Sequence, residues 1–479
     1  MSAEPKQNFP LNSTSWSRRS FLAASGVAAL GGLAACASES DTKSSPGGGK
    51  PGADAPKEVF TAPTTKLSGD LKILLWSHFV PAHDTWFDPF VKEWGKKVGV
   101  NVIVDHVNTA EVTGRLASEI QSGSGHDLVQ HISTLSQFEP GVVDLKDVTE
   151  EAEKRWGKQL ELCQKSSLNP KTGKYYAYAP GWVPDPGNFR SSLWSGIGMP
   201  EGPTTWDELL QGGSEIKSSK GIQMGIGMSQ EIDSNMVGRS LLWSFGGSLQ
   251  DADERVVLNS PESIEAVEFM AKLFKGTMTD EVFSWNAASN NQGLIAGKLS
   301  YIVNSISAWR TAQEQNPAVA DDVLFLPALS GPGGQFAAQH VMYNWVVPSF
   351  SKNVDAAKEF LLHYTANFAP VTYHSQLYDW CAWDSLTPQL DGWLDKDPFG
   401  AKPADKLNAF SNAIDWSVNI GYPGPANTAI GELYGTFVIP NMYARVAQGK
   451  QSAKDSVAQA AKQCEATFAK WRSQGLVGG

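Results

Sequence analysis

Apolar positions in the early part of the chain follow two alternating periods. Short apolar runs at Leu71–Trp76, Val100–Val104 and Asp127–Ile132 are typical of buried strands. Between these runs, apolar residues recur every three to four positions, as in amphipathic helices, and Gly99 and Gly123 mark the helix ends. Strand, helix, strand, helix, strand in this order predicts parallel strand pairs with right-handed crossovers, and hence an α/β fold.

The length of the chain bears on the number of folding units and on where a ligand would bind. A chain of 479 residues is too long for a single hydrophobic core, so we expect two lobes. In parallel sheets, ligands bind at the carboxyl ends of the strands. The residues that follow the first and third predicted strands, Trp76–His78 and His131–Thr134, are therefore the first candidates for a binding site.

The N-terminus carries a pattern that is typical of exported proteins. Arg18 and Arg19 precede an uncharged apolar run, 21–35, that is too short to cross a bilayer as a helix. The arginine pair resembles a twin-arginine (Tat) export signal, and the ending at Cys36 resembles a lipobox, in which the cysteine becomes the lipidated first residue. These resemblances imply a signal peptide over 1–36. They also imply a lipid anchor at Cys36 that holds the protein on the outer face of the bacterial cytoplasmic membrane, or in the periplasm.

Composition narrows the class of protein further. Small and polar residues dominate 37–68 without an apolar period, which predicts a flexible linker. The formal net charge of -11 argues against nucleic-acid binding, since phosphate recognition depends on basic clusters. No later apolar run approaches the length of a membrane-spanning helix. Beyond the predicted lipid anchor, Cys163, Cys381 and Cys464 allow either one disulfide with one thiol or three buried thiols.

Several segments share the motif pattern of one family. Residues 203–209 read Pro-Thr-Thr-Trp-Asp-Glu-Leu, in which Thr205 and Glu208 can close a helix capping box. Further matching segments lie at 120–129, 174–180, 292–304, 324–327, 351–361 and 438–440. With these motifs the chain resembles a family 1 extracellular solute-binding protein of a bacterial ABC importer, of the carbohydrate type. The resemblance covers nearly the whole chain beyond the signal peptide.

The resemblance implies an architecture and a set of partners. The fold would be a two-lobed α/β periplasmic-binding-protein type II fold with a ligand cleft between the lobes. The first lobe would span 69–181 and resume at about 327–376, and the second would span 182–326 and resume at about 377–479. The implied partners are a small-molecule solute, foremost a carbohydrate, the permease subunits of an ABC importer, and the membrane through the lipid anchor. The protein itself would be a monomer.

Catalytic motifs are absent from the sequence. It contains no G-x-S-x-G, no H-E-x-x-H and no Walker A loop. The spacing of His126 and His131 places them on opposite faces of a strand, which argues against a shared metal. The carboxylates of Asp251, Asp253 and Glu254 fall in a polar stretch that is typical of a solvated turn. We therefore predict a protein that is not an enzyme and that carries no cofactor and no metal.

Candidate ligand-binding residues are polar or aromatic groups at strand ends and lobe crossings. Rings that stack on sugar faces and planar groups that bridge hydroxyls would together form a sugar site. Each candidate has an alternative role as a packing residue, a turn histidine or a cap. The set is His78, His131, Thr134, Trp182, Trp243, Asn304, Ser307, Trp309, Tyr343, Trp383 and Asp384.

The predicted function is capture of a sugar or oligosaccharide between the lobes and its delivery to a membrane permease. The 17 tryptophans favour a sugar, because sugar sites need flat apolar surfaces. One alternative is a protein of the same fold that binds a polyol, a sugar phosphate or a polyamine. The other is a lipid-anchored extracellular glycan hydrolase, which would require two carboxyl groups roughly 5–9.5 Å apart in a cleft.

Overall fold

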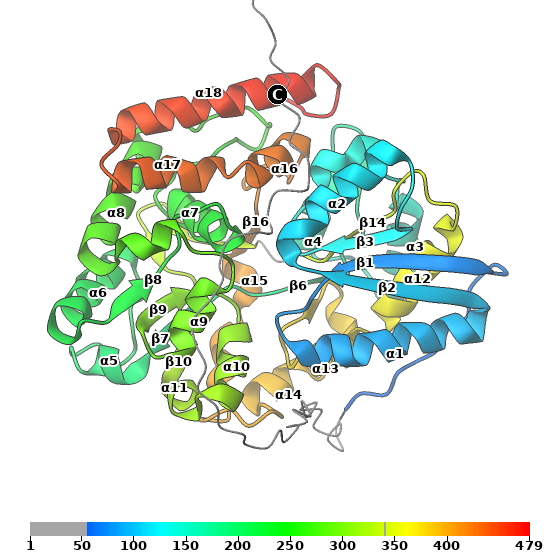
Figure 1. Ribbon diagram of the computed structural model, residues 1–479, viewed down its shortest axis with the longest axis horizontal. Coiled ribbons are helices and arrows are strands. Elements are labelled where there is room, and N and C mark those ends of the chain that lie inside the picture. The colour runs from blue at the N-terminus through cyan, green and yellow to red at the C-terminus, as the bar shows by residue number, and fades with distance from the viewer. Residues whose placement is uncertain (1–54, 340–341) are drawn as a thin grey trace, which may run out of the picture. The chain divides into compact units, whose positions relative to one another are not determined.

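Two four-stranded sheets organise the computed structural model, which describes residues 55–339 and 342–479. Figure 1 shows one sheet in each half of the view, with β6 (Gly181–Trp182) running between them. The predicted signal peptide, with Arg18, Arg19 and Cys36, lies outside the described residues. Within the described residues, we find no helix with the length and apolar character that a membrane crossing requires.

The first sheet has the strand order β14-β3-β1-β2. Strand β1 pairs in parallel with both β2 and β3, while β14 joins the edge antiparallel to β3. The strands are β1 (Gly69–Trp76), β2 (Val100–Val107), β3 (Leu128–His131) and β14 (Asn344–Val346). The surrounding helices are α1 (Pro81–Val98), α2 (Thr109–Ser122), α3 (Lys146–Trp156), α4 (Glu161–Lys165), α12 (Val354–Ala366) and α13 (Phe368–His374). The predicted alternation of three strands and two helices is confirmed.

Local signals explain where these first helices end. Gly99 and Gly123 follow α1 and α2 in the left-handed conformation, with φ of 81° and 68°. In that conformation a side chain would be strained, so glycine ends both helices at low cost. The predicted helix ends at these two glycines are therefore confirmed.

Gly95 in α1 and Gly114 in α2 are both helical glycines, but their surroundings differ. A Cβ atom at Gly95 would lie 2.5 Å from the Val100 carbonyl oxygen and 2.6 Å from Val102, whereas a Cβ at Gly114 would meet nothing within 4 Å. We expect Gly95→Ala to destabilise the protein by about 1–3 kcal/mol through overpacking of α1 on β2. The matched Gly114→Ala should stabilise it by about 0.5–1 kcal/mol through helix propensity. Urea unfolding measures the unfolding free energy of both variants. A shift of both values in the same direction, relative to the parent chain, would contradict the prediction.

The second sheet has the strand order β10-β7-β9-β8. Strands β8 and β9 are parallel, and β7 lies antiparallel to both β9 and β10. The strands are β7 (Gly187–Arg190), β8 (Gln223–Gly225), β9 (Leu299–Val303) and β10 (Val323–Leu326). The helices of this half are α5 (Ser191–Ser195), α6 (Trp206–Lys220), α7 (Ile232–Ser244), α8 (Pro261–Thr277), α9 (Ser289–Ile295), α10 (Ser307–Gln315) and α11 (Pro317–Asp322). Helix α6 begins with the predicted capping box, in which Thr205 accepts a hydrogen bond from the Glu208 amide.

The C-terminal third of the chain completes both halves. The remaining helices are α14 (Leu390–Asp395), α15 (Ala413–Trp416), α16 (Thr428–Gly435), α17 (Val438–Ala447) and α18 (Ala453–Arg472). Short two-stranded ribbons join β4 (Leu168–Asn169) to β5 (Lys174–Tyr175), β6 to β15 (Trp380–Cys381), β11 (Ser330–Gly331) to β12 (Gly334–Gln335), and β13 (Ala337–Gln339) to β16 (Ser417–Asn419). The β6–β15 ribbon brings the first crossing between the halves beside the chain that follows α13.

The return of the chain to the first half occurs later than predicted. We expected the first lobe to resume at about 327, but Ser330 bridges to Thr205 and donates a hydrogen bond to the Thr204 carbonyl. A Cβ atom at Gly331 would lie 2.5 Å from the Ser244 carbonyl oxygen of α7. Residues 330–335 therefore pack on the second half, and the chain re-enters the first sheet at β14.

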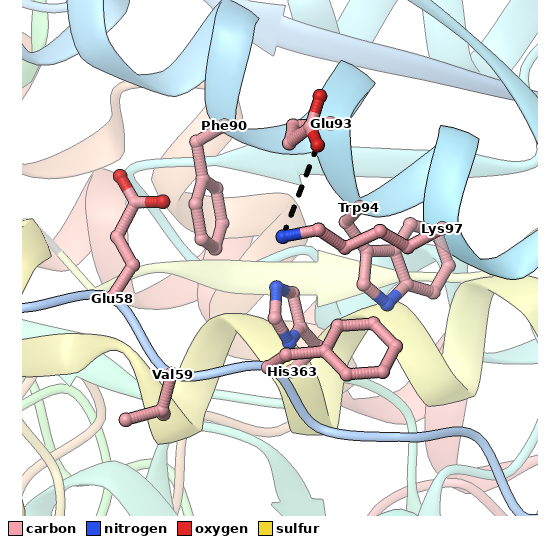
Figure 2. A pocket seen from close by; sticks show the side chains of 8 residues that line it. Glu58, Val59, Phe90, Glu93, Trp94, Lys97 and His363 are labelled. Atoms are coloured by element: carbon pink, nitrogen blue, oxygen red, sulfur yellow. Dashed lines mark ion pairs between the residues drawn. The ribbon is translucent and has the colours of Figure 1, made fainter.

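The final part of the predicted flexible linker is ordered. The Val59 amide donates to Asn367 Oδ1 over 2.7 Å, and the Thr64 amide donates to Glu359 Oε1 over 2.8 Å. A small pocket of about 170 Å³ lies beside this segment, and Glu58, Trp94 and His363 are among the residues that line it (Figure 2). The prediction of a linker that is flexible up to residue 68 is therefore wrong for these residues, because α12 supplies partners for their backbone amides.

All three cysteines in the described part of the chain are free and buried. Burial raises the pKa of the Cys163, Cys381 and Cys464 thiols, which keeps them protonated and unreactive. Of the two possibilities that the sequence left open, the structure shows three buried thiols.

Candidate functional site

The carboxyl end of β1 leads into a buried cluster of histidine, tyrosine and aspartate. His78, two residues after β1, places Nε2 at 3.2 Å from Asp379 Oδ1. The Tyr343 hydroxyl donates a hydrogen bond to the same carboxylate oxygen. His78 and Tyr343 were both predicted as ligand-binding residues, and the structure brings them together around Asp379, just before β15.

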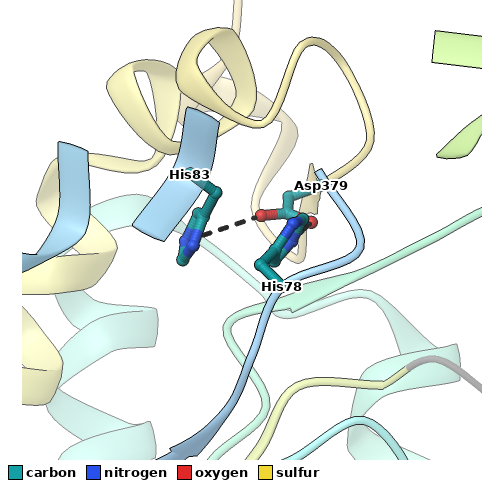
Figure 3. Close-up of side chains that lie close together, drawn as sticks. All are labelled: His78, His83 and Asp379. Atoms are coloured by element: carbon teal, nitrogen blue, oxygen red, sulfur yellow. Dashed lines mark hydrogen bonds and ion pairs between the residues drawn. The ribbon is translucent and has the colours of Figure 1, made fainter. Parts of the chain in front are cut away.

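A second histidine, His83 in the first turn of α1, completes this cluster. Its ring stacks on His78 with ring centroids 4.3 Å apart, and its Nε2 lies 3.9 Å from Asp379 Oδ2 (Figure 3). On the other side of the ring, Nδ1 lies 3.1 Å from Asp84 Oδ1. Burial, together with the neighbouring His78, lowers the pKa of His83, so the neutral imidazole is favoured.

Polar groups from both halves meet next to this cluster at Tyr378. Its ring lies edge-on to His78, with ring centroids 5.1 Å apart. Burial raises the pKa of Tyr378, and the nearby carboxylates of Asp185 and Asp233 raise it further, as does Asp379. Asp185 belongs to the crossing between β6 and β7, and Asp233 to the first turn of α7. Tyr378 thus links the end of β1 to carboxylates from the crossing and from the second half.

A row of amides extends this region within the second half. Asn290 Nδ2 donates to Asp233 Oδ2 over 2.8 Å, and Asn304 Nδ2 donates to Asn291 Oδ1 over 2.5 Å. Asn291 in turn approaches the Ser307 hydroxyl at 3.3 Å. Of the predicted residues, Asn304 and Ser307 therefore lie together at the carboxyl end of β9.

The two halves are also in direct contact at α16. Ser136 Oγ donates to the Asn427 carbonyl over 2.7 Å, and the Tyr176 hydroxyl donates to the Ala426 carbonyl over 3.0 Å. Tyr434 on α16 lies near Ser133, which follows β3. The two halves therefore touch each other directly at the start of α16, through polar side chains that are buried.

Three of the predicted tryptophans pack into the hydrophobic cores. Trp243 packs edge-on against Tyr422, and Trp383 donates from Nε1 to the Gly157 carbonyl over 2.8 Å. Trp309 contacts Phe325 edge-on and carries the Arg310 guanidinium 4.3 Å above its ring. In this structure the three rings are covered by protein, at 1–2% exposure each, and ligand contact by them stays a prediction.

The other predicted residues lie in or just after β3, in the β6–β15 ribbon and at the surface. Asp384 is exposed at the protein surface, outside the contact between the halves. His131 accepts from the Ser133 amide and contacts the Thr109 carbonyl, while Thr134 bonds to the Tyr176 hydroxyl. Trp182 pairs with Trp380 in the β6–β15 ribbon, so its place is at the crossing itself.

Sequence reasoning missed the carboxylates and amides that the fold gathers at this site. Asp185 stands between Pro184 and Pro186, and this proline-rich crossing was the one local signal for its position. Asp233 and Asn290 carry no local signal, because a helix start and a polar loop need the same residue types. The alternative of a sugar phosphate loses support, since Arg190 pairs with Asp322 and Arg310 pairs with Asp397.

Comparison with protein families settles the class of protein. Residues 81–367 match the model of the bacterial extracellular solute-binding proteins. The chain belongs to this family. The predicted family is thereby confirmed, and the protein is a solute binder of the extracellular class.

Relatives of this solute-binding protein are distant in sequence. An arabinooligosaccharide-binding protein of Bacillus subtilis is 22% identical over 316 residues, which cover 61% of this chain and 69% of the relative. A Deinococcus radiodurans protein named Probable ABC transporter-binding protein is 24% identical over 195 residues, covering 38% of this chain and 46% of that protein.

Solved structures confirm the fold of this solute-binding protein. The maltose-bound structure of T. maritima MalE3 superposes with a TM-score of 0.68 at 19% identity, over 83% of this chain and 99% of that chain. A sugar transporter of Arthrobacter chlorophenolicus with bound laminaribiose gives 0.69 at 17% identity, over 83% and 99% of the two chains. The predicted two-lobed periplasmic-binding-protein fold is confirmed, and the two halves are its two lobes.

Proposed function

We propose that this protein captures a sugar or oligosaccharide between its lobes and delivers it to the permease of an ABC importer. The observation that carries the proposal is the buried polar region around Tyr378, to which both lobes and the crossing contribute. The proposed contacts are Asp185, Asp233, Asn290, Asn304 and Tyr378. Carboxylates and amides of this kind bridge neighbouring hydroxyls on a sugar ring.

Two partly exposed aromatic rings would supply the apolar side of such a site. Trp285, close to Gly225 at the end of β8, packs at the border of both hydrophobic cores. Phe79 lies 5.0 Å from the Trp76 ring at the end of β1. A sugar ring that stacks on one of these side chains would lie within the closed lobes, with its hydroxyls turned to the polar groups.

Ligand entry requires that the lobes separate. Asn304 and Asp233 are each 6% exposed, and Asp185 is fully buried, so a solute cannot reach them in the closed form. A sugar that contacts both lobes would bind the closed form more tightly than the open form and would shift the population towards it. The permease would then recognise the closed form.

The names of the relatives support this ligand class. The relatives include an arabinooligosaccharide-binding protein, and the solved structures include complexes with maltose and laminaribiose. We also propose that the protein is exported through a Tat signal at Arg18 and Arg19 and is anchored by a lipid at Cys36. We propose further that it is a monomer, and that its chain re-enters the first lobe at β14.

The test is a tryptophan-fluorescence titration of the full chain with mono- and disaccharides, arabinooligosaccharides, polyols and polyamines. We expect saturation at micromolar sugar, with the sugar recovered unchanged. Recovery of cleaved sugar would replace the proposal with the hydrolase alternative. Saturation with polyamines alone would contradict the sugar assignment, and would assign Asp185 and Asp233 to the binding of a cation.

Asp233→Asn is expected to weaken sugar binding by about 10- to 100-fold, because hydrogen bonds to charged groups contribute about 1.5–3 kcal/mol. Asparagine has the same size as aspartate, and its side-chain oxygen can still accept the hydrogen bond from Asn290 Nδ2. Asp251→Asn, in the surface turn beside Arg255, is the matched control and should bind as the parent does. Equal affinities for both variants would remove Asp233 from the proposed site.

A further inference from the structure

We infer that His78, His83 and Asp379 form a binding site for a divalent transition-metal ion, and that Zn²⁺ is the ion that the ligand set suits best. The donor atoms of the three residues lie within 4.8 Å of one another, and all three residues are buried. Figure 3 shows the two imidazole rings beside the Asp379 carboxylate, with a dashed line between His83 and Asp379. Two imidazoles and one carboxylate are a donor set that binds zinc in proteins.

Two hydrogen-bond acceptors face each other in this cluster without a donor between them. The proton on His83 Nδ1 is directed to Asp84 Oδ1 at 3.1 Å, which leaves Nε2 with its lone pair. That lone pair faces Asp379 Oδ2 at 3.9 Å, and in the described residues neither atom has a hydrogen-bond partner. His83 is 5% exposed and Asp379 is fully buried, so this arrangement is costly unless a cation occupies it.

The outer contacts of the cluster are those that metal-binding side chains use. His83 is held by a carboxylate, and His78 Nδ1 lies 3.1 Å from the Val80 carbonyl, to which it can donate. Such partners fix the ring orientation. At His83 the carboxylate leaves Nε2 free for the metal, whereas His78 has to change its tautomer before its Nε2 can bind. The Tyr343 hydroxyl bonds to Asp379 Oδ1, so the carboxylate presents Oδ2.

Metal binding would change the tautomer of His78. In the metal-free protein the Val80 amide donates to His78 Nδ1 over 2.9 Å, so Nε2 carries the proton and donates to Asp379. When the ion binds, Nε2 becomes a ligand and its proton is transferred, by way of solvent, to Nδ1, so the ring stays neutral and no net proton is released. The protonated Nδ1 then donates to the Val80 carbonyl, and the Val80 amide has to give up its bond to this ring.

An occupied site requires the donor atoms to draw together and the two stacked rings to turn. Bonds of about 2.0–2.2 Å in a tetrahedral zinc site place neighbouring donors roughly 3.3 Å apart. Here His78 Nε2 lies 3.2 Å from Asp379 Oδ1, His83 Nε2 lies 3.9 Å from Asp379 Oδ2, and the donors of all three residues lie within 4.8 Å of one another. Asp84, whose side chain is 24% exposed, connects the cluster to solvent.

A bound ion would join two segments that are distant in sequence. His78 and His83 belong to the turn from β1 to α1, and Asp379 belongs to the segment that leads into the β6–β15 crossing. Tyr378 precedes Asp379 directly, so the ion would also restrain the position of Tyr378. The metal site is distinct from the proposed sugar site and supports one wall of it.

The experiment is isothermal titration of the purified full chain with Zn²⁺ after treatment with a chelator, together with metal analysis of the dialysed complex. We expect one Zn²⁺ per chain with a dissociation constant in the micromolar range or below, and a rise of the thermal midpoint by at least about 2 °C. His83→Gln and Asp379→Asn should weaken binding by at least tenfold and abolish the rise of the midpoint. Circular dichroism of the metal-free variants checks that they fold.

His126→Gln is the matched control, because His126 is also buried and also lies between two carboxylates, Glu119 and Asp105. This variant should bind Zn²⁺ as the parent chain does. Two results would overturn the inference. One is a parent chain that shows no saturable Zn²⁺ binding, and the other is folded His83→Gln and Asp379→Asn variants that bind with the affinity of the parent. Sugar titrations of the same metal-free samples test the proposed function independently of Zn²⁺ binding, so that either claim can fail without the other.

Discussion

Replacing Asp397 with alanine is expected to cost about 3–5 kcal/mol of unfolding free energy, the range for breaking a buried ion pair from one side. Arg310 in α10 donates two hydrogen bonds to this carboxylate, of 2.9 and 2.7 Å, and the two side chains are 2% and 0% exposed. Burial lowers the pKa of Arg310, and Asp397 opposes this effect. Asp397→Ala would leave the guanidinium charge buried without its partner. Urea unfolding monitored by circular dichroism measures the loss.

The pair Lys402–Asp321 provides the control for this prediction. Its nitrogen and oxygen are 3.3 Å apart, but the side chains are 73% and 51% exposed. Water and salt screen such a pair, so Asp321→Ala should change the unfolding free energy by less than about 1 kcal/mol. A loss of less than 1 kcal/mol in Asp397→Ala would show that the Arg310 charge finds water or another partner when the carboxylate is removed.

Acidification from pH 6.5 to pH 4 is expected to destabilise the protein through His131. Burial lowers the pKa of His131 to about 4, although the hydrogen bonds of its ring with the Thr109 carbonyl and the Ser133 amide oppose this effect. In the unfolded chain the ordinary pKa is about 6.5, so the unfolded state takes up the proton first as the pH falls. Stability is therefore fully present above pH 6.5 and declines towards pH 4, with a total loss of about 3 kcal/mol from this residue.

His131→Gln should remove this contribution, because glutamine can donate and accept in the same place but does not titrate. Urea unfolding at several pH values should give a shallower slope for the variant between pH 6.5 and 4. The slope should not vanish, since burial also lowers the pKa of His363 to about 4. Parallel pH profiles for parent and variant, whatever their offset at pH 7, would contradict the assignment.

The sequence was most informative where a structural feature depends on neighbouring residues. The glycines after α1 and α2 and the capping box of Thr205 and Glu208 act within one helical turn, and all were predicted correctly. The order of strands and helices in the first lobe followed from the apolar period. The re-entry of the chain into that lobe was placed too early, because 330–335 is fixed by contacts with α6 and α7 that no local pattern reveals.

The site was less accessible to sequence reasoning for two physical reasons. Asp379 lies about 300 positions from His78 and His83, so only the assembled fold shows that the three side chains share one point. In addition, tryptophan serves equally well in a core and on a binding surface, and Trp309 and Trp383 lie in the core. Four of the predicted residues lie in polar clusters, namely His78, Tyr343, Asn304 and Ser307. Their contact with a ligand stays a prediction.

The hydrogen bonds from residues 59–64 to α12 determine which lobe would stay with a membrane anchor. Asn367 and Glu359 belong to the first lobe, so the segment that they hold moves with that lobe. The chain that precedes residue 59 is thus attached to the first lobe and not to the second. A tether upstream of this segment would act on the first lobe, and the second lobe would be the one that is free to move relative to it.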